Sequence, residues 1–390
     1  MRTIPQIERR RLELMEWRHD LHAHPELAYE EHRTAAFVAA QLRAFGLEVH
    51  EGLARTGVVG TLSTGSGPSV ALRADMDALP IAEANDFDHR SRYAGKMHAC
   101  GHDGHTVMLL GAARRLAESP TFDGTVRFVF QPAEEGAAGA RVMIEEGLFE
   151  RFPVDAIFGM HNWPGVPVGR FAMRVGPIMA SLDTFDIRVE GKGAHGALPH
   201  LGVDPIVAAA KIVDMLQTLV SRNVDPMRAA VVSVTKIHGG EAHNVIPERV
   251  ELGGGLRCFE AEVRAELKRR LRLVATSTAT ALDARATVEF GLSFPAVVNT
   301  AAEAHLAAEA AAAVVGEAQV DTAAEPVLGS EDFAYMLERK PGCYVFIGNG
   351  DAPGNCMIHN PQYDFNDDIL TVGASYWVRL AEAFLARRLA

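Results

Sequence analysis

The sequence lacks the features that would tie the chain to a membrane, to nucleic acid or to an oxidising compartment. It has no apolar run of about 18 residues, the length that a membrane-spanning helix needs, and its first residues have no signal-peptide core. There are 38 basic residues against 50 acidic ones, and this net charge of −12 argues against a general nucleic-acid or acidic-membrane binder. The four scattered cysteines include no C-x-x-C pair, which favours free thiols over disulfides or a redox motif. We therefore expect a cytoplasmic protein.

The sequence does contain an ordinary globular composition and many histidines. Its 390 residues suffice for two or three domains, and 48% hydrophobic with 23% charged residues is typical of a folded chain. Sixteen histidines occur, several of them beside Asp, Glu or Cys. Chemistry is expected where these residues gather.

Strands and helices alternate along the first 180 residues. The spacing of apolar residues predicts helices over 7–21, 35–45 and 139–146 and after residue 104, and strands over 57–62, 69–73, 125–131 and 154–160. Such alternation predicts an α/β sheet with helices on its faces. After residue 295 the pattern resumes with a helix, a strand over 343–348 and a long helix from about 367.

The segment between these parts has a different order. It follows strand, helix, strand, strand, helix, strand, which is the split β-α-β order of ferredoxin-like domains. We therefore predict a discontinuous first domain, residues 1–180 with 295–390, and an inserted second domain, residues 181–294.

The stretch MHACGHDGH, residues 97–105, is the sharpest indication of chemistry. Cys100 and His102 would put a thiolate and an imidazole on one glycine-rich loop, close enough to bind metal ions together. These ligand types suit zinc, manganese, nickel or cobalt better than magnesium or calcium. A histidine-rich surface turn is the alternative interpretation of this stretch.

Two adjacent carboxylates, Glu134 and Glu135, follow the apolar strand 125–131. In an open α/β sheet, ligands bind at the carboxyl ends of strands, and neighbouring carboxylates repel each other unless a cation is present. A metal pair explains both, because one carboxylate can bind metal while the other accepts a proton from water. Taken alone, a solvated Glu-Glu pair at a helix start is the commoner case.

Three further residues are weak candidates singly but share a location. His161 ends the strand 154–160 and is expected beside the strand that leads to Glu134. Asp75 follows the strand 69–73 and could fix the tautomer of an imidazole. His359, in the run MIHNP, lies near the C-terminus. Placement at strand ends favours one common site.

Motifs spread in order over nearly the whole chain resemble the M20 metallopeptidase family. They look most like its branch of aminoacylases, hippurate hydrolases and auxin-conjugate (IAA-amino acid) hydrolases, and they are MHACGHDGH, QPAEEGAAGA, GMHNWP, GKGAHGALPH, HNVIP, GSEDFAYM and IHNPQYDFND. The resemblance implies a zinc-exopeptidase-like catalytic α/β domain with a mixed sheet, interrupted by a ferredoxin-like βαββαβ lid domain.

The resemblance also implies roles for the site residues. Two divalent metal ions per subunit (Zn, Mn, Ni or Co) would be held by Cys100, His102, Glu135, His161 and His359. Cys100 would bridge the ions, and Glu134 would be the general base. The wider family has a metal-binding His where this chain has Arg73, two residues before Asp75. Cys100 and His102 would take over that coordination, with Asp75 supporting them.

In the lid, the resemblance implies that His195 polarises the scissile carbonyl of the substrate and stabilises the oxyanion. In relatives such a histidine can serve the neighbouring subunit, which implies a homodimer or higher homo-oligomer. Asn244 would be a polar ligand of the substrate. Arg257 has the right chemistry to bind a substrate carboxylate through two hydrogen bonds, with a surface salt bridge as an equal alternative. No role follows for Asp332 in the SEDF run.

The implied activity is metal-dependent hydrolysis of the amide bond of a small N-acyl amino acid, of the hippurate or N-acetyl type. Alternatives within the same family are a dipeptidase or carboxypeptidase and an N-acetyl-diaminopimelate deacetylase. A metal-binding scaffold without catalysis is the alternative from another class. Glu134, which coordination would not require, argues against the scaffold.

Overall fold

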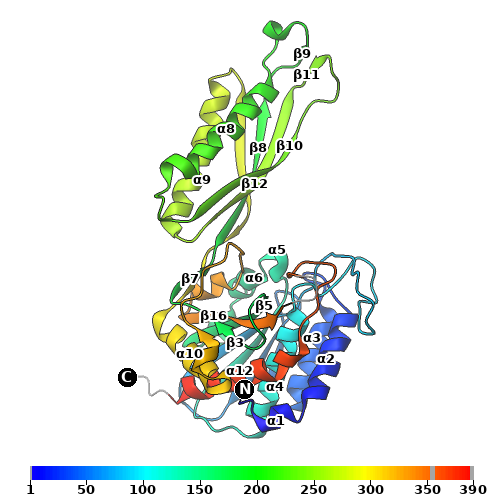
Figure 1. Ribbon diagram of the computed structural model, residues 1–390, viewed down its shortest axis with the longest axis vertical. Helices are drawn as coiled ribbons and strands as arrows, with labels where there is room; N and C mark the ends of the chain where they lie inside the picture. Colours follow the sequence, from blue (N-terminus) through cyan, green and yellow to red (C-terminus); the bar gives the residue numbers. More distant parts are fainter. Residues whose placement is uncertain (1, 352–355, 387–390) are drawn as a thin grey trace. The chain divides into compact units, whose positions relative to one another are not determined.

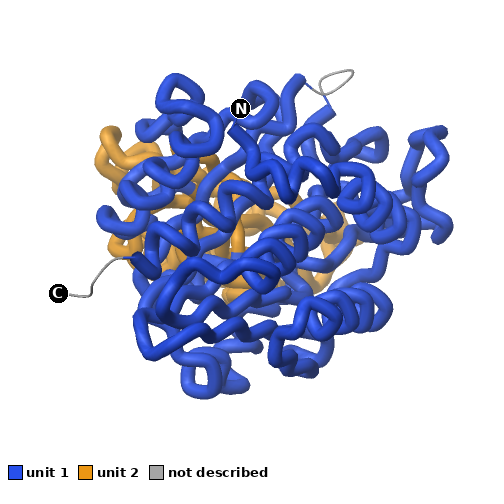
Figure 2. The backbone as a smooth tube through the Cα atoms, turned by 90° about the horizontal axis from the view of Figure 1, so that it is seen from below, with its two compact units in different colours: residues 1–178, 298–325, 332–390 blue, residues 179–297, 326–331 orange. Residues whose placement is uncertain are grey.

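The computed structural model describes residues 2–351 and 356–386, and these form two compact units (Figure 2). Unit 1 comprises Met1–Ile178, Val298–Glu325 and Asp332–Ala390, whereas unit 2 comprises Met179–Val297 and Pro326–Glu331. The chain therefore passes between the units four times. The short segment Pro326–Glu331 belongs to unit 2 because Ala180 donates backbone hydrogen bonds to the carbonyl oxygens of Val327 and Gly329.

Unit 1 is built on an eight-stranded mixed sheet with helices packed against it (Figure 1). In spatial order its strands are β1 (Glu48–Leu53), β2 (Gly57–Ser63), β4 (Thr125–Gln131), β3 (Ser69–Asp75), β5 (Ala156–Pro164), β16 (Gly342–Gly350), β6 (Phe171–Ala172) and β15 (Val320–Asp321). The central strands β4, β3, β5 and β16 are parallel, and β1 and β2 are antiparallel to their neighbours. The predicted mixed-sheet α/β class is confirmed.

The order of the central strands corrects one expectation. The strand that carries His161, β5, does not lie beside β4, because β3 lies between them. The three strands are nonetheless parallel, so their carboxyl ends reach the same edge of the sheet. Strand β5 also continues past His161 to Pro164, so that histidine lies within the strand.

Helices α4 (His102–Glu118) and α12 (Leu370–Leu385) pack against each other and against β3, and they form the centre of the core of unit 1. Gly111 of α4 permits this approach, since a Cβ there would lie 3.2 Å from the Cβ of Ala374. Around them lie α1 (Pro5–Glu8), α2 (Arg11–Ala23), α3 (His32–Ala44), α5 (Glu134–Ala137), α6 (Gly139–Glu145), α7 (Leu148–Arg151), α10 (Ala301–Val315) and α11 (Ala334–Leu337). Among the residues described, no helix combines the length and apolar character that a membrane span needs.

Unit 2 has the order strand, helix, strand, strand, helix, strand. The elements are β8 (Ser181–Glu190), α8 (Pro205–Asn223), β10 (Ala230–His238), β12 (Arg249–Cys258), α9 (Ala261–Thr280) and β13 (Arg285–Phe294). The sheet order is β10-β12-β8-β13 and every neighbouring pair is antiparallel. This is the split β-α-β arrangement.

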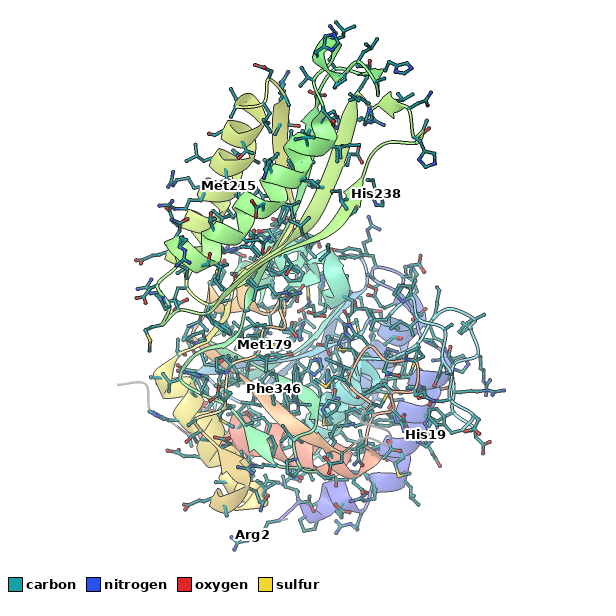
Figure 3. The ribbon with its side chains drawn as sticks, turned by 45° about the horizontal axis from the view of Figure 1, so that its top comes forward. Arg2, His19, Met179, Met215, His238 and Phe346 are labelled. Carbon is teal, nitrogen blue, oxygen red and sulfur yellow. The ribbon has the colours of Figure 1, made fainter. Side chains whose placement is uncertain are left out.

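The sequence of unit 2 explains its two layers. In β8 the buried residues alternate with more exposed ones, as a sheet with one covered face requires, and Phe185, Ile187 and Val189 join the core with α8 and α9. Helix α8 starts where the Asp204 side chain accepts hydrogen bonds from the backbone N–H groups of Ile206 and Val207. The outer face of α8 carries residues such as Met215, which is 43% exposed (Figure 3). In unit 1, by contrast, Phe346 on β16 is buried.

Candidate metal centre

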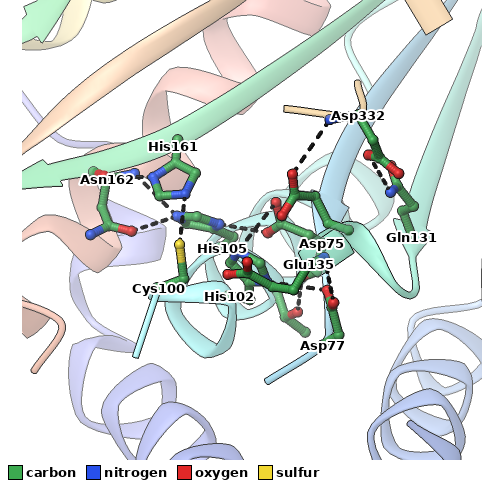
Figure 4. Close-up of polar contacts among 12 residues, drawn as sticks. Asp75, Asp77, Cys100, His102, His105, Gln131, Glu135, His161, Asn162 and Asp332 are labelled. Atoms are coloured by element: carbon green, nitrogen blue, oxygen red, sulfur yellow. Dashed lines mark hydrogen bonds and ion pairs between the residues drawn. The ribbon is translucent and has the colours of Figure 1, made fainter. Parts of the chain in front are cut away.

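Polar residues gather at the carboxyl edge of the parallel strands in unit 1 (Figure 4). Asp75 is the last residue of β3, Gln131 is the last residue of β4, and His161 lies in β5. Apart from the arginines Arg73 and Arg127, the strands are mostly apolar and buried before these residues, so burial of the strand carries each polar side chain into an enclosed edge. The packing of the strands therefore brings these polar side chains together at one edge of the sheet.

A tight turn at Gly101 separates Cys100 from His102. Gly101 has φ +91°, and a Cβ at this position would lie 2.2 Å from Oδ1 of Asn162, so a side chain would be both strained and blocked. The turn ends the loop there, and His102 is the first residue of α4 rather than a loop residue. This places the thiol and the imidazole on the same side of the helix start.

The Glu134–Glu135 segment is an irregular turn. Ala133 and Ala138 flank it with φ +58° and +56°, values that non-glycine residues rarely adopt. Surrounding contacts hold this conformation: the Glu31 carboxylate accepts a hydrogen bond from the Ala133 backbone N–H at 2.9 Å. Strained backbone of this kind is frequent at functional sites.

All five predicted metal ligands come together. Two groups of side chains have ligand atoms within 4.8 Å of one another: Cys100, His102 and His161, and Cys100, Glu135 and His359. Cys100 belongs to both groups, and its Sγ lies 3.3 Å from Nε2 of His161. In the second group, Nε2 of His359 lies 3.1 Å from Oε1 of Glu135, and His359 is itself held at φ +66°. Glu134 forms a further group with His102 and Glu135.

Hydrogen bonds set the histidine tautomers. Nδ1 of His161 donates to the carbonyl oxygen of Asn162 at 2.6 Å, and Nδ1 of His102 donates to the Asp77 carboxylate at 3.3 Å. In the neutral rings both Nε2 atoms therefore keep a lone pair. Within the described part of the chain, Nε2 of buried His102 makes no hydrogen bond. A buried acceptor without a partner is what a metal ion would satisfy.

The electrostatics also favour a cation. Burial and the carboxylates of Glu135 and Glu134 raise the pKa of the Cys100 thiol well above its usual range. Burial lowers the pKa of His102, but Asp75 and Asp77 outweigh that effect and raise it to about 10. Negative charge thus dominates the cluster. A divalent ion would offset this charge and favour the thiolate that coordinates metal.

His161 differs from His102 in its electrostatic surroundings. Burial and the neighbouring His105 lower the pKa of His161 well below its usual range. The ring therefore stays neutral, as metal coordination requires. The residues present fit two divalent ions in ligand type, and an ion would have to displace the protons of the Cys100 thiol and of His102.

Sequence reasoning missed Asp77 and the role of His105. Asp77 contacts His102 through one oxygen, and its other oxygen accepts a hydrogen bond from the Glu135 backbone N–H at 2.8 Å. His105 bonds Asp75 at 2.6 Å and Asn162 at 2.7 Å (Figure 4). The spacing of Asp75 and Asp77 is a signal that could have indicated Asp77, because residues two apart after a strand can lie on one side.

The candidate residues of unit 2 form their own local arrangement. His195, in β9 (Ala194–His195), pairs with Val245 in β11 (Val245–Ile246), next to Asn244. The Gly196 N–H donates to the Asn244 carbonyl oxygen at 2.8 Å, and the His195 and Asn244 side chains are exposed. Arg257, in β12, donates through Nη1 to the Leu328 carbonyl oxygen at 2.6 Å, and burial lowers its pKa.

The fold and this donor set together define a metalloenzyme of the α/β class. The model of peptidase family M20/M25/M40 matches residues 71–383, and the chain belongs to that family. It is 40% identical over 386 residues to a hippurate hydrolase of Campylobacter jejuni, which covers 99% of this chain and 100% of that protein. It is 42% identical to IAA-amino acid hydrolase ILR1-like 2 of Arabidopsis thaliana, covering 96% of this chain and 87% of that protein.

A solved structure shares the fold over nearly the whole chain. The Bacillus subtilis YXEP protein, a dinuclear metal-binding peptidase from the M20 family, has a TM-score of 0.84 and 37% sequence identity. The similarity covers 97% of this chain and 99% of that one. With these relatives, the chain is a metal-dependent amidohydrolase.

Proposed function

We propose that the protein hydrolyses the amide bond of small N-acyl amino acids, with two divalent metal ions bound in unit 1. The observation that carries the proposal is the pair of donor groups that share Cys100, with the Glu134 carboxylate beside them. The full-length relatives support the substrate class, since hippurate and IAA-amino acid conjugates are both N-acylated amino acids.

One ion would be held by Cys100, His102 and His161, and the other by Cys100, Glu135 and His359. When bound, such ions polarise an amide carbonyl and lower the pKa of a shared water molecule. Their identity among zinc, manganese, nickel and cobalt follows from metal availability as much as from the ligands.

Glu134 is the general base in this proposal. Its carboxylate is buried and lies within 4.8 Å of ligand atoms of His102 and Glu135, so a water molecule bound at the cluster would be within its reach. It takes the proton from the attacking water and returns it to the leaving amine. Asp75 and Asp77 hold the histidine rings, so the donor set stays in place during proton transfer.

Unit 2 is proposed to be the lid that completes the site in a cytoplasmic homo-oligomer. His195 would stabilise the developing oxyanion, and Asn244 beside it would bind the substrate. Within the described chain, the one side-chain hydrogen bond of Arg257 goes to Leu328, so its remaining N–H groups are available for a substrate carboxylate.

A substrate panel tests the proposed reaction. Purified, metal-loaded protein is incubated with N-benzoylglycine, N-acetyl amino acids, N-acetyl-diaminopimelate and dipeptides, and the released amino group is quantified. We expect the highest kcat/KM on an N-acyl amino acid. A preference for dipeptides would show that the protein is a peptidase instead. A preference for N-acetyl-diaminopimelate would show that it is a deacetylase of that compound. Metal binding without turnover of any amide would show that it is a metal-binding scaffold.

A further inference from the structure

Arg73 lies beneath the metal centre and joins three buried acceptors. Its guanidinium donates from Nε to Gln131 at 2.8 Å, from Nη1 to Asp75 at 2.7 Å, and from Nη2 to Asp332 at 3.3 Å. All four side chains are fully buried. A buried ion pair is a weak source of stability, because desolvation offsets most of the attraction. The arrangement therefore calls for a role beyond stability.

One branch of this network leads to the metal ligands. Asp75 binds Nδ1 of His105 at 2.6 Å, and its other oxygen lies 3.8 Å from Nε2 of His102. That second oxygen is also the one that accepts the hydrogen bond from Arg73. The guanidinium therefore keeps Asp75 turned so that one oxygen faces each histidine.

The other branch clamps the turn that carries Glu134. The Asp332 carboxylate accepts hydrogen bonds from Nε2 of Gln131 at 2.7 Å and from the Ala140 backbone N–H at 2.9 Å. These two residues stand immediately before and after the irregular segment 132–139. The Asp332 backbone N–H donates to Oε1 of Glu134 at 3.4 Å. The Asp332 carboxylate thus binds both ends of the irregular turn. The backbone N–H of the same residue donates a hydrogen bond to the Glu134 side chain.

We infer that Arg73, Gln131 and Asp332 are positioning residues that fix the Glu134 carboxylate relative to the Asp75–histidine side of the metal centre. The role rests on the proposed assignment of Glu134 as the base. It also gives Arg73, which cannot bind metal, and Asp332 their places in the site. None of the three contacts substrate in this account; each acts through Glu134 or Asp75.

Two variants separate the branches. Asp332→Asn keeps the side-chain size but removes the charge opposite Arg73, so Glu134 is less well held. We expect kcat to fall at least tenfold, KM to stay within threefold, and two metals per chain to remain. Arg73→Lys cannot reach three acceptors, so Asp75 loosens. We expect zinc affinity of the metal-free protein, measured by titration calorimetry, to fall about tenfold, as for other groups behind metal ligands.

The matched control is Asp183→Asn in unit 2. Asp183 is an equally buried carboxylate held by Arg264 at 2.6 Å and by Lys268 at 2.6 Å, and it has no part in the Arg73 network. We expect a lower melting temperature but kcat per metal-loaded chain within twofold of wild type. If Asp332→Asn behaves like this control, or loses activity only in step with metal or folding, the inference is wrong.

The readouts also distinguish this inference from the proposed function. If the wild-type protein cleaves no N-acyl amino acid, the proposed function is wrong. The zinc affinity of Arg73→Lys tests the positioning role independently of activity, and an unchanged affinity would show that Arg73 does not position the metal ligands. Should Arg73→Lys not fold, Gln131→Met removes the hydrogen bonds that Gln131 makes to Arg73 and to Asp332 without altering charge. Because Gln131 no longer holds Asp332 in that variant, we expect kcat to fall at least fivefold with two metals bound, and wild-type kcat would overturn the inference.

Discussion

Glu134 and Glu135 are neighbours in the chain but meet different atoms. The Glu135 side chain faces Cys100 and His359, and its backbone N–H bonds Asp77. The Glu134 side chain faces the Asp332 backbone N–H instead. The irregular turn, with left-handed Ala133 and Ala138, gives the two carboxylates different partners although they lie within 4.8 Å of each other. This geometry is the basis for giving one of them to metal and the other to proton transfer.

Glu134→Gln tests that division. We expect two metals per chain to be retained and kcat to fall by about 10²–10⁴-fold, the range for loss of a general base. Glu145→Gln, on the exposed surface of α6, is the control and should leave kcat unchanged. Metal content by mass spectrometry and steady-state kinetics decide the matter; activity close to wild type would remove Glu134 from the mechanism.

His22 gives a pH prediction for stability. Burial lowers its pKa, but hydrogen bonds to Asp103 and Glu83 outweigh burial and raise it from 6.5 to about 9. A raised pKa in the folded state means that the stabilisation is complete below pH 6.5 and is lost as pH rises through about 9. Its full size is on the order of 3 kcal/mol.

The measurement is the free energy of unfolding of wild type and His22→Gln across this pH range. Their difference should shrink as pH rises from 6.5 to 9. His305→Gln, at an exposed position of α10, is the control and should give a small difference that does not vary with pH. If the difference in free energy of unfolding between wild type and His22→Gln did not change with pH, the stabilisation would not come from a charged His22 bound by Asp103 and Glu83.

At this scale the motifs predicted which side chains gather but not what supports them. Residue type and spacing predicted a metal-binding loop at Cys100 and His102, whereas the choice of Glu135 over Glu134 as a ligand came from the resemblance to the M20 family. Asp332 is separated from Gln131 by about two hundred positions, and a buried hydrogen bond of that span leaves no local pattern in one sequence. The sequence showed that Arg73 stands where the wider family has a metal-binding His, but its role depends on hydrogen-bond partners from three segments of the chain.

At the scale of elements, α4 links the metal centre to the core. Its first residue is His102, and the helix then runs buried against α12 and β3. Two of its glycines differ in their surroundings. A Cβ at Gly104 would lie 2.3 Å from the ring of Phe365, whereas the nearest atom to a Cβ at Gly111 would be 3.2 Å away. Close packing at the first turn therefore requires glycine.

Gly104→Ala is expected to destabilise unit 1 by about 1–3 kcal/mol, because the buried Phe365 ring has to move. Gly111→Ala needs only a small adjustment and gains helix propensity, so it should cost less. Urea unfolding of the two variants, at equal metal content, provides the comparison. Equal stabilities would mean that the Phe365 contact does not constrain the helix.

Long elements were predictable and short ones were not. The strands 57–63, 69–75 and 125–131 follow from apolar periodicity, and their bounds differ from expectation by at most two residues. Strands β6 and β15 have two residues each, too few to show any period. The position of β3 between β4 and β5 is a matter of topology, which periodicity does not encode.

At the scale of the whole molecule, the chain builds its metal centre in unit 1 and exposes His195 and Asn244 in unit 2. If a homodimer shares its sites, His195→Ala and Glu134→Gln chains complement each other. An equal mixture, dissociated and reassociated, should recover about a quarter of wild-type activity, because half of the dimers hold one complete site. Each variant alone is the control, and a mixture no more active than their average would contradict sharing.

The ends of unit 2's long segment are neighbours, since Leu182 pairs with Phe294 across the antiparallel strands β8 and β13. A module that leaves and re-enters at adjacent points can be lengthened, shortened or exchanged without stretching its host. Recombination at this junction could therefore give the molecule a different inserted module while the ligands in unit 1 stay untouched. The same metal chemistry could thereby be adapted to new amides during evolution.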